Sequence, residues 1–330
     1  QGAFAFEGLN YFSQYKIRPE HDKDHLNGVT TLDLIIIQRH ILGMQELDNP
    51  YDLIAADVDR SEHISAIDLI QLRKLILGIY ETLPENDSWV FLPEDHKFID
   101  PFSPWNYPDH MYIEDMSVAH ENSDFLGIKI GDVNNSVQLN SSEDIEGRSR
   151  ESIFLSTYSG NYKKGDLVAI PIIIEDAMDL RGMQFTFDFD HESLLFQGVD
   201  GASLNVAQEN VALLNTQEGK ICFSISDAYS YELNSSELLF TIYFEAMSNL
   251  DIDGLIDINS SITKAEIYTD DFRSLDLEFV IRKGDETTKE FQLYQNEPNP
   301  FEASTSISFF NPERQFVRLS IMDANGRLVM

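Results

Sequence analysis

The chain contains the stretch VTTLDLIIIQRHILG at residues 29–43 and a second version of it, ISAIDLIQLRKLILG, at residues 64–78. The two copies align with a constant offset of 35 residues, which places Asp33 on Asp68 and Gly43 on Gly78. Each copy opens with oxygen-bearing side chains, continues as an apolar helix and ends at a glycine. An internal repeat indicates similar structural units packed together, and we predict two loop–helix units here.

The aspartates of each copy are spaced like the ligands of a twelve-residue calcium loop. Such a loop offers oxygens at positions 1, 3, 5, 7, 9 and 12, and position 7 contributes its backbone carbonyl. The second copy has oxygen at every one of these positions, namely Asp57, Asp59, Ser61, the carbonyl of His63, Ser65 and Asp68. The first copy would use Asp22, Asp24, Leu26, the carbonyl of Gly28, Thr30 and Asp33. We therefore predict calcium as the cofactor.

The first calcium loop has one gap, and both loops have an alternative explanation. Leu26 has no side-chain oxygen, so the first site would take a backbone carbonyl or water there, or bind calcium more weakly. Asp33 and Asp68 would also serve as helix N-caps, and the other aspartates would then lie in solvated turns. Capping alone does not explain a duplicated ligand set, which favours calcium.

Both loops end on Asp, whereas the loop of an EF-hand ends on Glu. With the D-L-x-x-L-R-K-x-I-L-G pattern that follows Ile67, the pair resembles the dockerin domain. This resemblance implies a cohesin partner, contacted by loop positions 10 and 11 and by basic residues of the helices. Carried over to this chain, those positions are Thr31, Leu32, Gln38, Arg39, Ala66, Ile67, Arg73 and Lys74. Leu32 and Ile67 would be exposed apolar docking residues, or they would pack beneath residues 84–130.

Residues 151–283 show the pattern of a β-sandwich. Short apolar or alternating runs are separated by Gly, Asn and Asp turns, and they cover residues 166–175, 184–188, 220–226 and 238–245. The segments LRGMQFTFDFD, LLFQGV and GKICFSIS in this region resemble a cohesin domain. The predicted fold class is therefore multidomain and mostly β, with a small α-helical calcium-binding module at residues 21–137.

Several further segments lie around these two modules. We expect residues 1–20 to form two strands, the tail of a preceding β-sandwich repeat. An aromatic- and proline-rich cover would span residues 81–137 and end in a strand at 125–130. Asp132 and Asn134, in GDVNN, would form a plain turn or contribute to a shared metal site. Linkers are expected at residues 138–150 and 284–290.

Residues 291–330 carry NEPNPF, TSISF and a D-x-x-G hairpin, and they resemble the type A C-terminal sorting domain of the type IX secretion system, incomplete in this chain. That resemblance implies export across the outer membrane, the type IX secretion machinery as a partner, and an extracellular or cell-surface location. The arrangement of modules resembles the C-terminal region of large Bacteroidetes surface proteins.

The composition and the motifs that the sequence lacks argue against two classes of function, nucleic-acid binding and catalysis. A net charge of −34 argues against nucleic acid as a partner, because phosphate binding needs clustered Lys and Arg. No nucleophile elbow, H-E-x-x-H, phosphate loop or C-x-x-C is present, and we predict no enzyme activity; Cys222 reads as a buried structural thiol.

We expect this chain to be the C-terminal region of a secreted or surface-anchored adhesin or scaffold. It would be stabilised by calcium and would assemble through dockerin–cohesin-like contacts. These contacts would form within one chain or head-to-tail between copies, and the second arrangement gives a homo-oligomer or filament. The alternative is the docking and export tail of an extracellular enzyme, such as a glycoside hydrolase, whose catalytic domain lies upstream.

Overall fold

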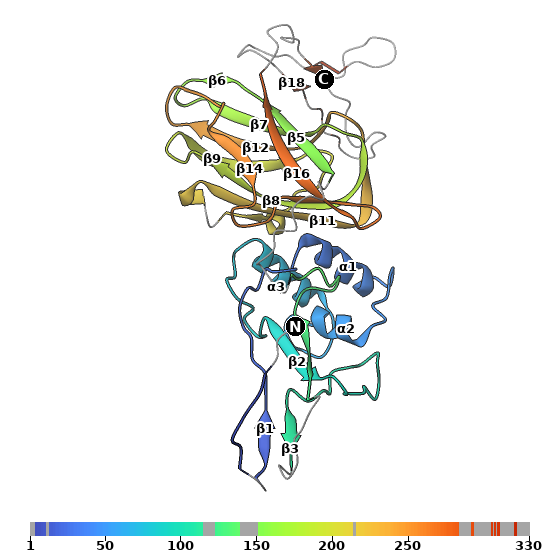
Figure 1. Ribbon diagram of the computed structural model, residues 1–330. Coiled ribbons are helices and arrows are strands. Elements are labelled where there is room, and N and C mark those ends of the chain that lie inside the picture. Colours follow the sequence, from blue (N-terminus) through green and yellow to red (C-terminus); the bar gives the residue numbers. More distant parts are fainter. Residues whose placement is uncertain are drawn as a thin grey trace. The chain divides into compact units, whose positions relative to one another are not determined.

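The computed structural model describes residues 4–10, 13–114, 123–138, 151–213 and 216–283, and a few positions beyond, namely 292–293, 305, 307, 309–310 and 320–321. The chain divides into a compact unit of residues 1–282 and a second unit of residues 283–330 (Figure 1). In the second unit, strand β17 (Gln292–Leu293) pairs antiparallel with β18 (Phe309–Phe310). Most of the predicted sorting domain and nearly all of both predicted linkers lie outside the described residues.

The two repeats form helices α1 (Thr31–Ile41) and α3 (Ala66–Ile76), with a further helix, α2 (Pro50–Ala56), between them. Thr30 and Ser65 cap the two repeat helices, each in a reciprocal capping box with the aspartate three residues later. Helix α2 is not evident from the repeat. It begins at Pro50, a residue suited to a first helical position, after an Asn49 cap.

The three helices share a core with two strands. Leu34 and Ile37 of α1 pack with Leu72 and Leu75 of α3. Strands β2 (Trp89–Pro93) and β4 (Phe125–Lys129) pair antiparallel and contribute Leu92, Ile128 and neighbouring residues to the same core. The strand predicted at residues 125–130 is therefore present as β4. Among the described residues, no helix has the length and apolar composition needed to cross a bilayer.

The N-terminal hairpin expected within residues 1–20 is not what the structure shows. Strand β1 (Tyr15–Ile17) pairs instead with β3 (Met111–Ile113), almost a hundred residues later. Residues 4–10 form no strand, and Phe4 and Phe6 remain exposed. Alternation of apolar residues predicted strand character but could not identify the pairing partner, because side-chain period alone does not specify which strand lies alongside.

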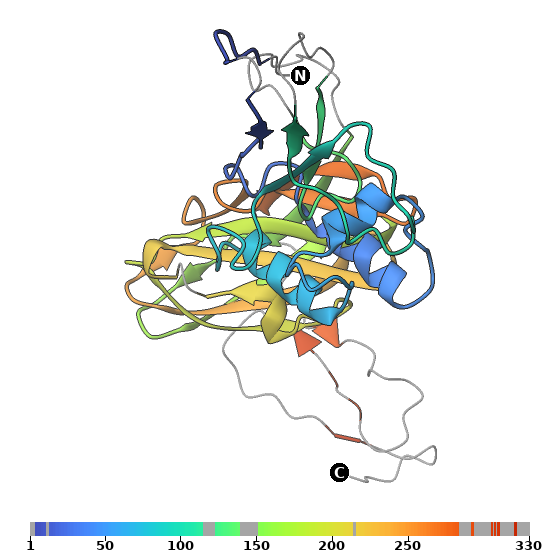
Figure 2. The same cartoon turned by 90° about the horizontal axis from the view of Figure 1, so that it is seen from below.

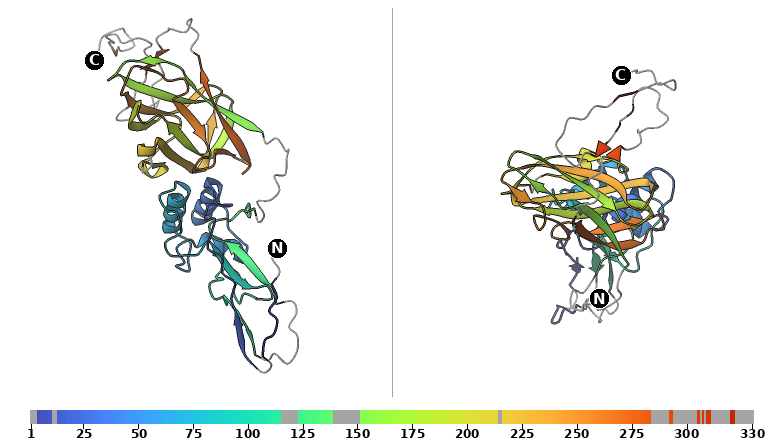
Figure 3. Two further views of the ribbon diagram at one scale, coloured as in Figure 1. Left: turned by 60° about the vertical axis from the view of Figure 1, so that its left-hand side comes forward. Right: turned by 90° about the horizontal axis from the view of Figure 1, so that it is seen from above.

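Residues 151–282 form the predicted β-sandwich, seen from further directions in Figures 2 and 3. Its ladder of hydrogen-bonded strands runs β10-β11-β8-β15-β16-β5-β7-β12-β9, with β14 paired to β8, and β16 and β5 are parallel. The bounds are β5 (Ser152–Tyr158), β7 (Leu167–Ile174), β8 (Met178–Phe189), β9 (Leu194–Gly201), β10 (Val211–Ala212), β11 (Lys220–Leu233), β12 (Glu237–Ala246), β14 (Ile256–Asn259), β15 (Glu266–Thr269) and β16 (Ser274–Arg282). A small separate pair joins β6 (Asn161–Tyr162) to β13 (Leu250–Asp251), and single 3-10 turns lie at Gln208–Asn210 and Thr216–Glu218.

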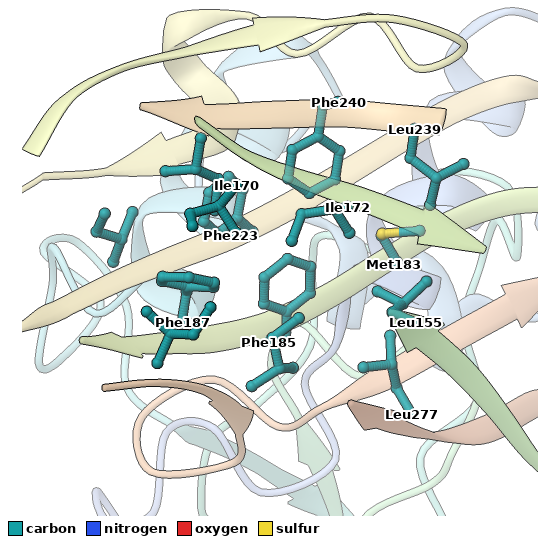
Figure 4. Close-up of a cluster of buried hydrophobic side chains, with 14 of the residues drawn as sticks. Leu155, Ile170, Ile172, Met183, Phe185, Phe187, Phe223, Leu239, Phe240 and Leu277 are labelled. Carbon is teal, nitrogen blue, oxygen red and sulfur yellow. The ribbon is translucent and has the colours of Figure 1, made fainter. Parts of the chain in front are cut away.

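Stacked phenylalanines fill the sandwich core (Figure 4). Phe185 of β8 lies 4.8 Å from Phe223 of β11 and 6.3 Å from Phe240 of β12, centroid to centroid. Strands β8 and β12 are not neighbours in the ladder, so the contact between Phe185 and Phe240 crosses from one layer to the other. Pairs of aromatic rings at such distances stabilise the core slightly more than the burial of their apolar surface alone would.

Candidate functional site

Three carboxylates converge where the loop after α2 enters the first turn of α3. Asp57, Asp59 and Asp68 each offer an oxygen that lies within 4.8 Å of the others, and within the described part of the chain they are the one such group of three acidic, His or Cys side chains. Asp57 and Asp68 are buried. The sequence predicted these three residues as positions 1, 3 and 12 of one calcium loop, and the fold brings them together.

Backbone hydrogen bonds hold this loop in a tight wrap. The carboxylate of Asp57 accepts from the backbone N–H of Ser61 at 2.8 Å and of Glu62 at 2.9 Å, and Asp68 accepts from the N–H of Asp59 at 3.0 Å. Arg60 and Glu62 have left-handed backbone angles, φ +57° and +65°, which residues other than glycine adopt at a cost in free energy. The loop therefore keeps a strained shape that directs its oxygens inward.

The electrostatics of this loop favour a bound cation. Burial raises the pKa of Asp57 to about 6, and the charges of Asp68 and Asp59 add to that effect. Burial likewise raises the pKa of Asp68, with a further contribution from Asp59. Carboxylates gathered in this way repel one another, and a divalent cation relieves the repulsion. The donor set consists of oxygens alone, as calcium prefers.

The residues predicted for the first calcium loop are not gathered in the same way. Asp22 accepts from the backbone N–H of Ser88 at 2.8 Å and lies 3.0 Å from Nε2 of His25. Asp22 and Asp24 form no group of three with Asp33 within the distance found in the 57–68 loop, although all three residues are described. Leu26 is 37% exposed.

Asp33 lies instead beside the GDVNN turn. It is fully buried, and its Oδ1 accepts from the backbone N–H of Val133 at 3.0 Å. Burial raises the pKa of Asp33 well above its usual value, and the carboxylate of Asp132 raises it further. The carbonyl of Gly28 accepts a hydrogen bond from Ser136 Oγ at 2.9 Å. The turn at residues 131–137 thus contacts both ends of the segment 28–33.

The second feature of the site is the contact between the helices and the sandwich. At the start of α1, the backbone N–H of Thr31 donates to Oε1 of Gln184 at 2.6 Å, and the hydroxyl of Thr31 lies 2.7 Å from that of Ser224. Gln184 is on β8 and Ser224 on β11, the strands with which α1 makes contact (Figure 1). All three side chains are buried.

Two arginines extend this contact along the helices. Arg39 of α1 donates to the carbonyl of Ala228 at 2.8 Å, and Arg73 of α3 donates to Ser226 Oγ at 2.9 Å. Both acceptors belong to β11. At the end of α3, the hydroxyl of Thr263 donates to the carbonyl of Ile76 at 2.8 Å, which satisfies one of the free carbonyls at a helix C-terminus.

Apolar packing completes the contact. Leu32 and Ile35 of α1 form a buried cluster with Tyr268 of β15. At Gly182 of β8, a Cβ would lie 3.1 Å from Cδ1 of Ile35 and 2.6 Å from the carbonyl oxygen of Ile225. Glycine at this position therefore allows the helix to approach the sheet closely.

Strands β8 and β11 are buried on both faces over residues 180–187 and 221–225. Phe185 and Phe223 point into the sandwich core, whereas the alternate residues Gln184 and Ser224 are buried beneath α1. An antiparallel sheet with one core face ordinarily shows its polar face to water. The sequence reasoning missed this docking face, because polar residues between buried phenylalanines indicate a solvated face as readily as a covered one.

The residues predicted to bind a protein partner make different contacts in the two copies. From the first copy, Thr31, Leu32 and Arg39 all contact the sandwich. From the second, Arg73 contacts it, Lys74 donates to Tyr80 within the helical module, and Ala66 and Ile67 are exposed, Ile67 by 53%. The expectation that Leu32 packs beneath residues 84–130 is not met, since its cluster includes Tyr268.

No protein-family model and no curated protein matches the chain. Solved structures similar to it include the protein CaCohA2 of Clostridium acetobutylicum (16% identity over 41% of this chain and 89% of that one, TM-score 0.32) and the sixth cohesin of scaffoldin B of Acetivibrio cellulolyticus, solved in complex with a dockerin (14%, 39% and 94%, TM-score 0.33). A non-cellulosomal cohesin of the archaeon Archaeoglobus fulgidus is also similar (17%, 39% and 86%, TM-score 0.30). These identities and scores are low, so we derive the function from contacts within this chain.

Proposed function

We propose that residues 21–282 are a non-catalytic docking unit in which the helical module is bound by the sandwich of the same chain. The observation that carries this proposal is the buried contact of Thr31 with Gln184 and Ser224. Polar groups that are buried together in a face of this kind need one another as hydrogen-bond partners, because a buried polar group without a partner destabilises the folded state. The face is thus complementary in hydrogen bonding as well as in shape.

Covalent connection favours docking within the chain over docking between chains. The helical module and the sandwich belong to one polypeptide, so their association is intramolecular and benefits from an effective concentration on the order of millimolar. Helix α1, which comes from the first copy of the repeat, is already covered by β8 and β11. A second molecule would have to displace this contact to form the filament considered above.

Calcium would act by fixing the loops that carry the docking helices. With Asp57, Asp59 and Asp68 unneutralised, their repulsion opposes the tight loop that leads into α3 and Arg73. A bound cation removes this repulsion and links the two ends of the loop, so binding energy becomes folding energy of the helix pair. Docking and calcium binding are then coupled through α3.

The wider setting of this unit is a proposal that rests on sequence resemblance. We place it in the C-terminal region of an exported, extracellular or surface-anchored protein, either an adhesin or scaffold or the tail of an extracellular enzyme. The predicted hairpin at residues 1–20 favoured the adhesin, as the end of a sandwich repeat. Because β1 pairs with β3, a strand of the helical module, that argument no longer separates the two settings.

The docking contact can be tested by a substitution on β11. Ser224→Arg in the full chain places a long charged side chain beneath Thr31, so hydrogen exchange in α1 should accelerate and the radius of gyration should rise. Tyr229→Arg is the matched control, because Tyr229 is exposed on the same strand. Unchanged exchange in α1 of a folded Ser224→Arg protein would refute docking.

A second measurement guards against a folding defect. Arg39→Ala removes the hydrogen bond to the Ala228 carbonyl and the cation–π contact with Phe272, so it should accelerate exchange in α1 more mildly than Ser224→Arg and leave the exchange of β7 and β12 unchanged. Light scattering in millimolar calcium should show a monomer at all concentrations. Growth of the particle with protein concentration would support docking between chains instead.

A further inference from the structure

We infer that the chain builds a second divalent-cation site from two segments that lie about a hundred residues apart. Residues 132–137 would supply the first half of a calcium loop, and residues 28–33 the second half. Binding here adds a cation to the calcium-dependent unit proposed above, and it can be tested independently of docking.

The first residue of each loop accepts the same pair of backbone hydrogen bonds. The carboxylate of Asp132 accepts from the backbone N–H groups four and five residues later, those of Ser136 and Val137, both at 2.9 Å. The carboxylate of Asp57 accepts from the groups at the same spacing, at 2.8 and 2.9 Å. Asp132 therefore stands where a loop has its first position.

Their sequences and backbones agree as well. DVNNS at residues 132–136 corresponds to DVDRS at residues 57–61, with identical first, second and fifth residues. At the fourth position Asn135 and Arg60 both have φ +57°. The third position holds Asn134 in one loop and Asp59 in the other, and each offers a side-chain oxygen.

The second halves continue the correspondence across the break in the chain. Ser136 Oγ donates to the carbonyl of Gly28 at 2.9 Å, as Ser61 Oγ donates to the carbonyl of His63 at 3.2 Å. The two carbonyls are the seventh positions of their loops. The capping box that joins the ninth and twelfth positions is also the same, for Thr30 N–H donates to Asp33 Oδ2 at 2.8 Å, and Ser65 N–H to Asp68 Oδ2 at 2.8 Å.

An oxygen left without a partner points to a ligand at this place. Oδ1 of Asn134 is buried, and it has no hydrogen-bond partner among the described residues. Asn134 lines a cavity together with Gly28 and Thr30. A buried polar atom of this kind costs free energy unless something binds it, and a cation coordinated by the third position of the loop would bind it.

The two carboxylates of the split loop interact with one cation, the buried Lys129, whose charge acts on both of them. Asp33 and Asp132 are 0% and 3% exposed, and in the described part of the chain neither forms an ion pair. The nearby buried amine of Lys129 donates instead to the carbonyl of His25 and to Ser88 Oγ, both at 2.8 Å. One ammonium group does not balance two buried carboxylates, which is costly, and a divalent cation would neutralise both.

The donor set predicts calcium bound more weakly than at residues 57–68. All donors are oxygens, which suits a hard cation, and affinity rises with the number of charged ligands. The split site has two carboxylates, Asp33 and Asp132, whereas the continuous loop has three. Leu26, the residue that interrupted the predicted first loop, is not needed in this arrangement.

Calcium counting on the full chain separates the split loop from the one read directly from the sequence. Isothermal titration with calcium chloride should give two ions per chain for the unaltered protein and one for Asp132→Ala. Asp24→Ala is the matched control and should retain two, since Asp24 is no ligand in the split arrangement. One ion for Asp24→Ala together with two for Asp132→Ala would overturn the inference.

Two further variants cover the remaining outcomes. Asn134→Ala should weaken the second binding step at least tenfold with an unchanged far-ultraviolet circular dichroism spectrum, which excludes unfolding as the cause. Asp59→Ala should remove the tighter ion and leave the weaker one. A single ion in the unaltered protein that disappears in Asp59→Ala would refute the split site, and the exchange test with Ser224→Arg would still stand for docking.

Discussion

The hydroxyl oxygens of Thr31 and Ser224 lie 2.7 Å apart although the residues are separated by 193 positions in the sequence. Both side chains are fully buried, so each hydroxyl replaces the water that the other has lost. Thr31 follows directly on Thr30, the cap of α1, and its position is therefore set by the loop that precedes the helix. A change in the shape of that loop should therefore move Thr31 relative to Ser224 of the sandwich.

A double-mutant cycle on this pair should reveal a positive coupling. Thr31→Val keeps the shape of the side chain, and we expect it to lower the free energy of unfolding by about 1–3 kcal/mol because Ser224 is left without a partner. Ser224→Ala should cost a similar amount. The double variant should cost less than the sum, by about 0.5–1.5 kcal/mol. Strictly additive losses in urea unfolding would show that the two hydroxyls do not interact.

Arg73 and Lys74 should behave differently although they are adjacent basic residues of one helix. Arg73→Ala removes the hydrogen bond to Ser226. Because Arg73 is a partly buried charged donor, we expect the free energy of unfolding to fall by roughly 1–3 kcal/mol and the melting temperature to fall with it. Lys74→Ala loses only a contact with Tyr80 in the same module and should change stability by about 0.5 kcal/mol or less. Similar losses for both, measured by calorimetry, would contradict the contact.

The parts of the fold governed by local pattern could be predicted from the sequence. The repeat placed α1 and α3 correctly, and short apolar runs located β7, β8, β11 and β12. These features depend on helix capping and on residue period, which are properties of neighbouring residues. The strand expected at residues 125–130 was found for the same reason.

The features that depend on distant segments could not be read in this way. The pairing of β1 with β3 and the contact of Asp33 with the turn at Val133 each join residues about a hundred positions apart. A spacing rule applied along the chain finds only continuous loops, so it assigned Asp22, Asp24 and Leu26 to the first site. Leu26, which has no side-chain oxygen, was the one position of that loop that departed from the ligand pattern.

Leu32 and Ile67 occupy the same position in the two copies and give a matched test of burial. Leu32 is 7% exposed and packs with Tyr268, whereas Ile67 is 53% exposed. Leu32→Ala should therefore cost about 2–5 kcal/mol, and Ile67→Ala about 0.5 kcal/mol or less. Thermal unfolding of the two variants side by side provides the measurement, and equal losses would show that the copies are used alike.

Removal of calcium should loosen the helical module. Addition of EGTA to the calcium-loaded chain should lower the melting temperature and increase cleavage by trypsin within residues 20–80. At a free calcium concentration of a hundred times the dissociation constant, one bound ion contributes about 2.7 kcal/mol. Magnesium added back should restore less stability, because it prefers to keep several of its waters. Unchanged cleavage after chelation would argue that calcium has no structural role.

Gly28 and Gly43 offer a final comparison, since both have positive φ, +82° and +65°. A Cβ at Gly43 would meet no atom within 4 Å, whereas one at Gly28 would lie 2.7 Å from Asp132 Oδ2, 2.7 Å from Val137 Cα and 2.8 Å from Val137 N. Gly43→Ala should cost about 1–2 kcal/mol from backbone strain alone. Gly28→Ala should cost more, because the whole 132–137 turn must move away.

The same pair of variants separates strain from metal binding. Displacement of the turn moves Asp132 away from Asp33, so Gly28→Ala should also lose the weaker calcium ion, while Gly43→Ala keeps both ions in isothermal titration. If Gly28→Ala lost no more stability than Gly43→Ala and still bound two ions, the turn would not be closed against residues 28–33 in solution. The ions would then have to be held by the continuous loops that the spacing of the aspartates first suggested.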